Sequence, residues 1–208
     1  MAHWDKRLRA WLGHGLPENY LTFDYETTGT NVKEDLALDF GFCVVRNKKV
    51  VKQQGFVLDW TQRPEWVDPE WLREKLEKLI YIFSMKKKPW VYTWDYLREH
   101  GRDPLKVLEF NLQLFQANRN VGALFVGHNA FKFDSPLFQN MSAEYLGETW
   151  WFEPDELFDT GCMEKASRSR ELNNPRMWLT PRAGESMADF FTAFTAPGWP
   201  GCTGTLNP

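Results

Sequence analysis

The sequence predicts an α/β fold in which a mixed β-sheet is flanked by helices. Three strand-like segments follow one another at residues 20–26, 36–46 and 50–60, with connections short enough for an antiparallel meander. Beyond residue 68, helical patterns alternate with short apolar strands, an order that is typical of strands added in parallel to a sheet. We therefore expect the meander and the later strands to share one sheet.

The first part of the chain is predicted to contain one short helix and then the three strands. Tryptophan and leucine recur at helical spacing over residues 4–12, which predicts the helix. The second and third strands flank Asn47 and Lys48, residue types that suit the turn of a β-hairpin. These features predict that the second and third strands pair directly.

Two Asp-Pro pairs predict the starts of the longer helices. Asp68 with Pro69, and Asp103 with Pro104, each combine a capping side chain with a residue favoured in the first helical turn. Apolar residues three and four apart continue both helices. The remaining predicted elements are a strand at 121–129, a helix at 135–146 capped by Ser135, a strand at 156–160 and a last helix at 184–194.

Length and charge limit the class of protein. A chain of 208 residues that is 43% hydrophobic can form one core, so we expect a single domain over 1–208 with a helical insertion at about 61–102. The 25 basic and 28 acidic residues give a net charge of −3. Such a chain does not bind nucleic acid through a uniformly basic surface. A polyanion must instead meet a local basic patch or metal ions.

Cysteine content and hydropathy predict the compartment. The three cysteines, Cys43, Cys162 and Cys202, are odd in number and widely spaced, which favours neither a disulfide framework nor a zinc cluster. No segment has the apolar length of a signal peptide or of a bilayer-spanning helix. We therefore expect a cytoplasmic protein with no membrane partner.

The first predicted strand carries two carboxylates, Asp24 and Glu26, in the run "FDYETTG". Side chains alternate across a strand, so both carboxylates lie on one face and Tyr25 on the other. Paired carboxylates repel each other and suit hard divalent cations such as Mg²⁺ or Mn²⁺. Solvated carboxylates at the end of a strand are the alternative, and the pair alone does not decide between the two.

Two motifs resemble those of the DnaQ-like (DEDD) 3′-5′ exonuclease superfamily. "FDYETTGT" is similar to the first motif of that superfamily and "GHNAFKFDSPLF" to the second, and the resemblance covers about residues 18–195. It implies a ribonuclease H-like fold and hydrolysis of phosphodiester bonds at nucleic-acid 3′ ends. The implied catalytic and metal-binding residues are Asp24, Glu26 and Asp134, which would hold two divalent ions. The implied substrate-binding residues are Thr27, Thr28, Gly29, Asn129 and Phe133.

Several residues near these motifs have ordinary structural readings as well. Gly29 would leave room for a nucleotide, but a plain turn would use the same glycine. The alternative for Phe133 is a place in the hydrophobic core. We interpret His128 as a structural hydrogen-bonding residue rather than a base. Asp159, in "LFDTGCM", resembles a supporting aspartate at the end of the last strand.

The final motif of the superfamily, a fourth aspartate with a histidine or tyrosine before it, is absent. No histidine follows His128, and Asp189 lies in the helix that normally precedes that motif. The chain ends at Pro208, about where the motif would begin, so we expect a truncated form. The alternatives are a degenerate homologue that binds nucleic acid without cutting it, and a site completed by Asp159 or by a partner.

The predicted partner is a single-stranded or 3′-end nucleic acid, with DNA favoured over RNA, and a replication complex is a second predicted partner. Two basic stretches are candidate contacts: residues 165–182, and the lysines at 86–88 beside Trp90 and Trp94. A solvated loop is the alternative reading of the first stretch. Trimming or proofreading is the predicted role, and a non-catalytic binding module or a small-molecule phosphodiesterase are the competing functions.

Overall fold

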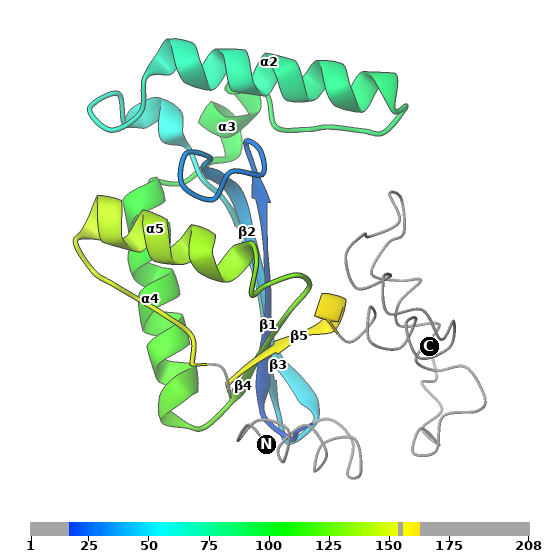
Figure 1. The fold of residues 1–208 in the computed structure, drawn as a ribbon, viewed down its shortest axis with the longest axis vertical. Helices are drawn as coiled ribbons and strands as arrows, with labels where there is room; N and C mark the ends of the chain where they lie inside the picture. The colour runs from blue at the N-terminus through cyan, green and yellow to red at the C-terminus, as the bar shows by residue number, and fades with distance from the viewer. Residues whose placement is uncertain (1–16, 154–155, 163–208) are drawn as a thin grey trace.

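A five-stranded mixed sheet forms the centre of the computed structural model, which describes residues 17–153 and 156–162 (Figure 1). The strand order is β3-β2-β1-β4-β5. The pairs β1–β2 and β2–β3 are antiparallel, whereas β1–β4 and β4–β5 are parallel, so the predicted mixed sheet is confirmed. The strands are β1 (Tyr20–Thr27), β2 (Ala37–Arg46), β3 (Lys49–Val57), β4 (Leu124–Gly127) and β5 (Leu157–Asp159). The predicted helices at 4–12 and 184–194 and the basic stretch at 165–182 lie outside the described residues.

The β2–β3 hairpin has the predicted turn, but its third strand ends early. Asn47 and Lys48 both have positive φ angles, of 49° and 62°, which match the right-handed twist of a two-residue hairpin. The prediction that the strand continues to Trp60 is wrong. Asp59 accepts a hydrogen bond from the amide of Thr61 and starts a short 3₁₀ helix, η1 (Trp60–Gln62). The buried indole of Trp60 then donates to the carbonyl of Ala37 at 2.7 Å.

Four α-helices are described: α2 (Pro69–Met85), α3 (Trp94–His100), α4 (Pro104–Asn120) and α5 (Asp134–Leu146). Both predicted Asp-Pro starts are confirmed. Asp68 accepts from the amide of Glu70 at 2.9 Å, and Asp103 from that of Leu105 at 3.1 Å. The short helix α3 was not predicted; Thr93 caps it by accepting from the amide of Tyr96.

The start of α5 differs from the prediction. Ser135 is not the cap, because the helix begins one residue earlier at Asp134 and Ser135 therefore lies in its first turn. Phe133 occupies the capping position without a side-chain hydrogen bond. The carboxylate of Asp134 is consequently available for a contact outside its own helix.

The core lies between one face of the sheet and the helices α4 and α5, which lie together on that face in Figure 1. Aromatic rings fill it: the fully buried Phe115 of α4 packs at ring-centroid distances of 5.2 Å from Phe23 and 5.0 Å from Phe138. Burial of such rings stabilises the fold by about 1.5–3 kcal/mol per side chain. The side chains that alternate with these core residues along each strand therefore point to the other face of the sheet.

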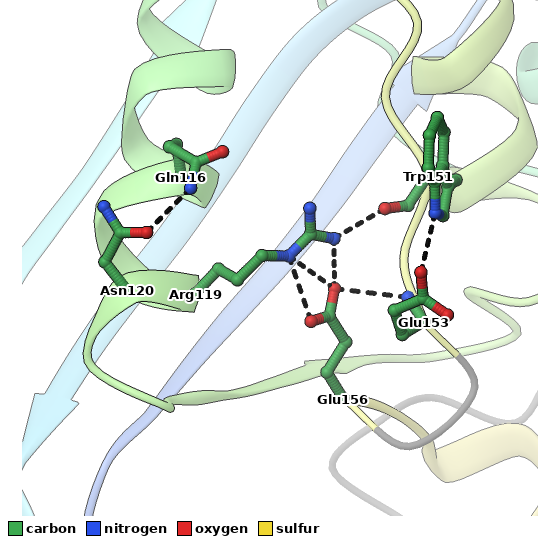
Figure 2. Close-up of polar contacts among 6 residues, drawn as sticks. All are labelled: Gln116, Arg119, Asn120, Trp151, Glu153 and Glu156. Atoms are coloured by element: carbon green, nitrogen blue, oxygen red, sulfur yellow. Dashed lines mark hydrogen bonds and ion pairs between the residues drawn. The ribbon is translucent and has the colours of Figure 1, made fainter.

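A polar clamp joins α4 to the segment before β5 (Figure 2). The guanidinium of Arg119 donates from Nε to both carboxylate oxygens of Glu156, at 2.9 and 3.0 Å, and from Nη2 to the carbonyl of Trp151 at 2.6 Å. It also stacks 3.9 Å from the ring of Trp150. The clamp fixes the chain just before β5, which pairs with β4.

The helical insertion leaves and re-enters the sheet region at one point. Leu58 bridges to Arg102, whose amide donates to the carbonyl of Val57 at 2.8 Å, and the amide of Asp59 donates to the carbonyl of Arg102 at 2.8 Å. Helices α2 and α3 lie between these residues and beyond the end of the sheet in Figure 1. None of the helices in the described part of the chain is long and apolar enough to span a bilayer.

Candidate active site

Asp24 and Glu26 lie on the sheet face opposite the core, as strand alternation predicts. Tyr25 between them is buried, and its hydroxyl accepts a hydrogen bond from the amide nitrogen of Asn111 at 3.0 Å. The side chains of Asp24 and Glu26 are exposed to solvent. The two carboxylates are thus presented outward by a strand that is anchored through its other face.

The strands beside Asp24 form an open groove. The sheet register pairs Asp24 with Gly41, and Gly41 with Gly55, so neither β2 nor β3 carries a side chain in that row. A Cβ atom placed on Gly41 would have no neighbour within 4 Å. The groove has a volume of about 720 Å³ and is lined by residues of β1 to β4 together with His128. It gives an extended ligand access to the sheet surface next to Asp24.

Asp134 reaches the same region from α5 and is only 2% exposed. The parallel pairing of β1 with β4 ends at Thr22 and Val126, and beyond that point this edge of β1 pairs with no strand of the described residues. Asp134 uses this edge: its Oδ1 accepts from the backbone amide of Tyr25 at 3.2 Å. The bond holds two segments that are 109 residues apart in the sequence.

Burial and mutual repulsion raise the pKa values of these carboxyls. Loss of hydration, reinforced by the charge of Asp24, raises the pKa of Asp134 to about 8. Asp24 and Glu26 reach solvent, yet neighbouring protein removes part of their hydration and raises both pKa values. Nearby His128 opposes the shift of Asp24, whereas Asp24 and Asp39 add to that of Glu26. A bound cation would therefore stabilise the ionised forms of all three groups.

The chemistry of the donors fits a hard divalent cation, because Asp24, Glu26 and Asp134 offer carboxylate oxygens only. Asp24 interacts electrostatically with each of the other two. Over residues 17–153 and 156–162, however, no three His, Cys, Asp or Glu side chains are grouped closely enough to hold one ion together. The structure brings the three predicted ligands to one region without gathering them into a single coordination shell.

Two residues at this site were missed by the sequence prediction. Asp39 of β2 lies directly opposite Glu26, and its Oδ2 accepts from the hydroxyl of Tyr92, in the insertion, at 3.1 Å. Asp39 could have been found, because it alternates with the buried Phe40 and Phe42. Tyr92 carries no comparable signal, since its contact with Asp39 spans 53 residues.

The loop after Glu26 is held by its own hydrogen bonds. The buried hydroxyl of Thr28 donates to Asp35 at 3.0 Å and accepts from the amide of Leu36 at 2.9 Å. A Cβ atom on Gly29 would lie 2.8 Å from the carboxyl carbon of Asp35. Thr27 donates to the carbonyl of Gly29 at 2.5 Å. Asp35 thus occupies the space beside Gly29. This favours the interpretation that the glycine is needed for the turn rather than to leave room for a nucleotide.

The second motif forms a tight loop around Asp159. The buried carboxylate of Asp159 accepts from the amides of Asn129 at 2.9 Å, Phe131 at 3.0 Å and Gly161 at 2.8 Å. Asn129 has a positive φ of 57°. His128 Nδ1 lies 3.1 Å from the hydroxyl of Thr160. These contacts agree with the supporting role expected of Asp159 and with the structural reading of His128.

Phe133 lies at the start of α5, where its ring is partly buried and packs against the hydrophobic core. This contact agrees with the core reading of Phe133. Its predicted role in substrate binding, like those of Thr27, Thr28, Gly29 and Asn129, stays a prediction.

Solved structures with a similar fold include those of exonuclease I. The chain matches a structure described as suggesting how exonuclease I achieves processivity, and another of E. coli exonuclease I in complex with a dA16 oligonucleotide. Each match has a TM-score of 0.52 and 17% sequence identity over 74% of this chain. The fold is ribonuclease H-like.

The similarity covers only part of exonuclease I. The chain spans 30% of the exonuclease I chain in both matches and 32% in a product-bound structure of exonuclease I. No protein-family model matches the sequence, and neither does any curated protein. At this identity, the comparison supports the ribonuclease H-like fold alone.

Proposed function

We propose that this chain is a metal-dependent 3′-5′ exonuclease domain that hydrolyses phosphodiester bonds at the 3′ ends of single-stranded DNA. The observation that carries the proposal is the hydrogen bond from the amide of Tyr25 to the buried Asp134. It holds a second-motif carboxylate beside Asp24, on the strand that also presents Glu26. The structural neighbour bound to a dA16 oligonucleotide supports DNA as the substrate class.

The proposed roles follow the placement of the carboxylates. Asp24, Glu26 and Asp134 would hold the two ions, Mg²⁺ or Mn²⁺, and Asp24 is the carboxylate that interacts electrostatically with both of the others. Such ions, when bound, lower the pKa of an attacking water and neutralise the scissile phosphate. The row from Asp24 to Gly41 and Gly55 leaves room for the sugar-phosphate backbone. We assign no general base among residues 17–153 and 156–162.

Digestion of a 5′-labelled oligonucleotide in Mg²⁺ tests the proposal. The variants Asp24→Asn, Glu26→Gln and Asp134→Asn keep the shape of each side chain, and each should lower the rate by about 100-fold or more. Glu109→Gln, on the exposed side of α4, is the matched control and should digest at the wild-type rate. Equal digestion by the wild type and the three site variants rejects the proposed site.

A non-catalytic nucleic-acid or replication-partner module is the second candidate. It is favoured by the lack of a three-ligand group within the described residues. A further neighbour is a complex of exonuclease I with an SSB C-terminal segment, at a TM-score of 0.51 and 16% identity. Oligonucleotide binding by the wild type without digestion in Mg²⁺ or Mn²⁺ supports this candidate. A cytoplasmic location is a separate prediction.

A further inference from the structure

The insertion forms an arm that projects from the proposed site. We define the arm as residues 78–93, which comprise the last turns of α2 and the segment that returns to α3. Figure 1 shows the C-terminal end of α2 projecting beyond the sheet on the side away from α4 and α5. Because Asp24 and Glu26 lie on the face opposite the core, the arm projects toward the side on which the carboxylates are exposed.

The two limbs of the arm are fixed to each other by aromatic contacts. The ring of Phe83 on α2 lies 4.4 Å from that of Trp90 on the return segment. Trp90 donates from its indole nitrogen to the carbonyl of Tyr92 at 3.1 Å. The guanidinium of Arg73 stacks 4.1 Å from the ring of Trp94. Trp90 thus braces the arm internally, and Trp94 at the start of α3 packs against α2 at the base of the arm.

The tip of the arm carries concentrated positive charge. Lys86, Lys87 and Lys88 are all exposed, at a chain reversal closed by a bond from the amide of Lys88 to the carbonyl of Phe83 at 3.0 Å. Between Glu77 and Asp95 the sequence has four lysines and no carboxylate, in a chain whose net charge is −3. No carboxylate of the described residues forms an ion pair with the three lysines at the tip.

An exposed apolar stripe leads to this tip. Tyr81 and Met85, four residues apart on α2, are 65% and 68% exposed. An exposed tyrosine beside lysines is the combination that single-stranded nucleic acid binds, because bases stack on the ring while cations contact the phosphates. The base of the arm meets the site through the bond from Tyr92 to Asp39.

We propose that the arm binds the backbone of single-stranded nucleic acid on the 5′ side of the end held at the carboxylates. Lys86, Lys87 and Lys88 contact phosphates, and Tyr81 stacks on a base. This assignment rests on the proposed function for the direction of the strand. It predicts that the arm contributes to the binding of strands long enough to extend from Asp24 to the tip, and not to that of shorter ones.

Fluorescence anisotropy in EDTA tests the arm without cleavage. The triple variant Lys86→Gln, Lys87→Gln, Lys88→Gln is compared with a matched triple, Lys48→Gln, Lys49→Gln, Lys52→Gln. The matched lysines lie near the β2–β3 turn, at the end of β1 opposite Glu26. The probes are labelled oligothymidylates of about 4 and about 16 nucleotides.

The tip variant should bind the long probe at least about tenfold more weakly than the wild type and bind the short probe equally. Its salt slope for the long probe should fall by roughly 2, because each lost phosphate contact removes about 0.7. Tyr81→Ser should weaken binding of the long probe by about tenfold, and Tyr81→Phe should restore it. The proposed role of the arm is wrong if the two triple variants lose equal affinity for the long probe. It is also wrong if the tip variant binds that probe like the wild type, or if the wild type does not bind it.

The outcome is separable from that of the proposed function. If the wild type digests DNA and the tip variant binds it unchanged, the proposed role of the arm is rejected and the exonuclease proposal stands. If binding depends on the arm but no digestion occurs in Mg²⁺ or Mn²⁺, the exonuclease proposal is rejected and the arm remains a nucleic-acid-binding surface.

Discussion

Asp134 should make the stability of the protein depend on pH in the absence of divalent ions. Burial, with the charge of Asp24, raises the pKa of its carboxyl to about 8 in the folded chain. A carboxyl with a raised folded-state pKa stabilises the fold fully below its unfolded-state pKa, near 4, and loses that contribution as the pH rises to about 8. We expect the free energy of unfolding in EDTA to fall by on the order of 3 kcal/mol between pH 5 and pH 8.

Urea unfolding of the wild type and of Asp134→Asn measures this effect. The variant keeps an oxygen that can accept from the amide of Tyr25 but has no titrating proton, so its stability should change less over that range. Asp35 and Asp103 do not mask the effect. Despite burial, hydrogen bonds from Lys75 and Arg63 hold their pKa values below the usual range, so they act only at more acidic pH. The same pH slope in both proteins would contradict the assignment.

Gly29 should be far less tolerant of alanine than Gly41. A Cβ atom on Gly29 meets the Asp35 carboxylate, which is already held by Thr28, Lys75 and the amide of Asn31. Gly29→Ala should therefore cost about 1–3 kcal/mol of unfolding free energy. Gly41→Ala points into open space and should change it by less than about 0.5 kcal/mol. Urea midpoints compare the two, and equal costs would contradict the packing described for the loop.

Among the helices, α4 depends on Asp103 for two separate interactions. Its carboxylate caps the helix at Leu105 and also pairs with Arg63, just after η1. Asp103→Asn retains a capping oxygen and loses the charge, so it should cost less than about 1 kcal/mol. Asp103→Ala loses both interactions and should cost about 1–2 kcal/mol. Denaturant unfolding compares the two variants. Equal losses of unfolding free energy would mean that the ion pair with Arg63, and not the cap, accounts for the whole effect.

The elements that could be predicted are those whose signals are adjacent in the sequence. The Asp-Pro starts of α2 and α4 and the turn at Asn47 and Lys48 depend on neighbouring residues only. Helix α3 was missed because it has 7 residues, too few for a clear apolar repeat. The start of α5 was misplaced by one residue because Ser135 has the residue type of a cap, whereas the position before the helix is taken by Phe133, which forms no side-chain capping bond.

Over the whole molecule, divalent ions should stabilise the folded chain if the proposed metal site is correct. A ligand that binds only the native state raises its stability by about 2.7 kcal/mol at a hundred times its dissociation constant. We expect Mg²⁺ to raise the thermal midpoint at pH 8, and Asp24→Asn and Asp134→Asn to reduce that rise. Sodium chloride at matched ionic strength is the control. An equal rise in the variants would place the ion elsewhere.

The parts of the candidate site differ in how far the sequence could reveal them. Alternation along one strand was enough to place Asp24 and Glu26 on the same face. The approach of Asp134 to β1 depends on where the β4 pairing stops, which no local pattern encodes. The contact of Tyr92 with Asp39 depends on how the insertion folds back, so it required the three-dimensional structure.

The closure of the insertion at Leu58 and Arg102 determines which part of the chain can change in length without disturbing the sheet. Both ends of the segment meet at one backbone bridge, so a change in the length of the chain between them leaves that closing point in place. The entropy of closing a loop grows only logarithmically with its length. Only the stretch between Leu76, which is buried in the core, and Tyr92, which bonds to Asp39, can therefore change in length while β1 continues to present its carboxylates.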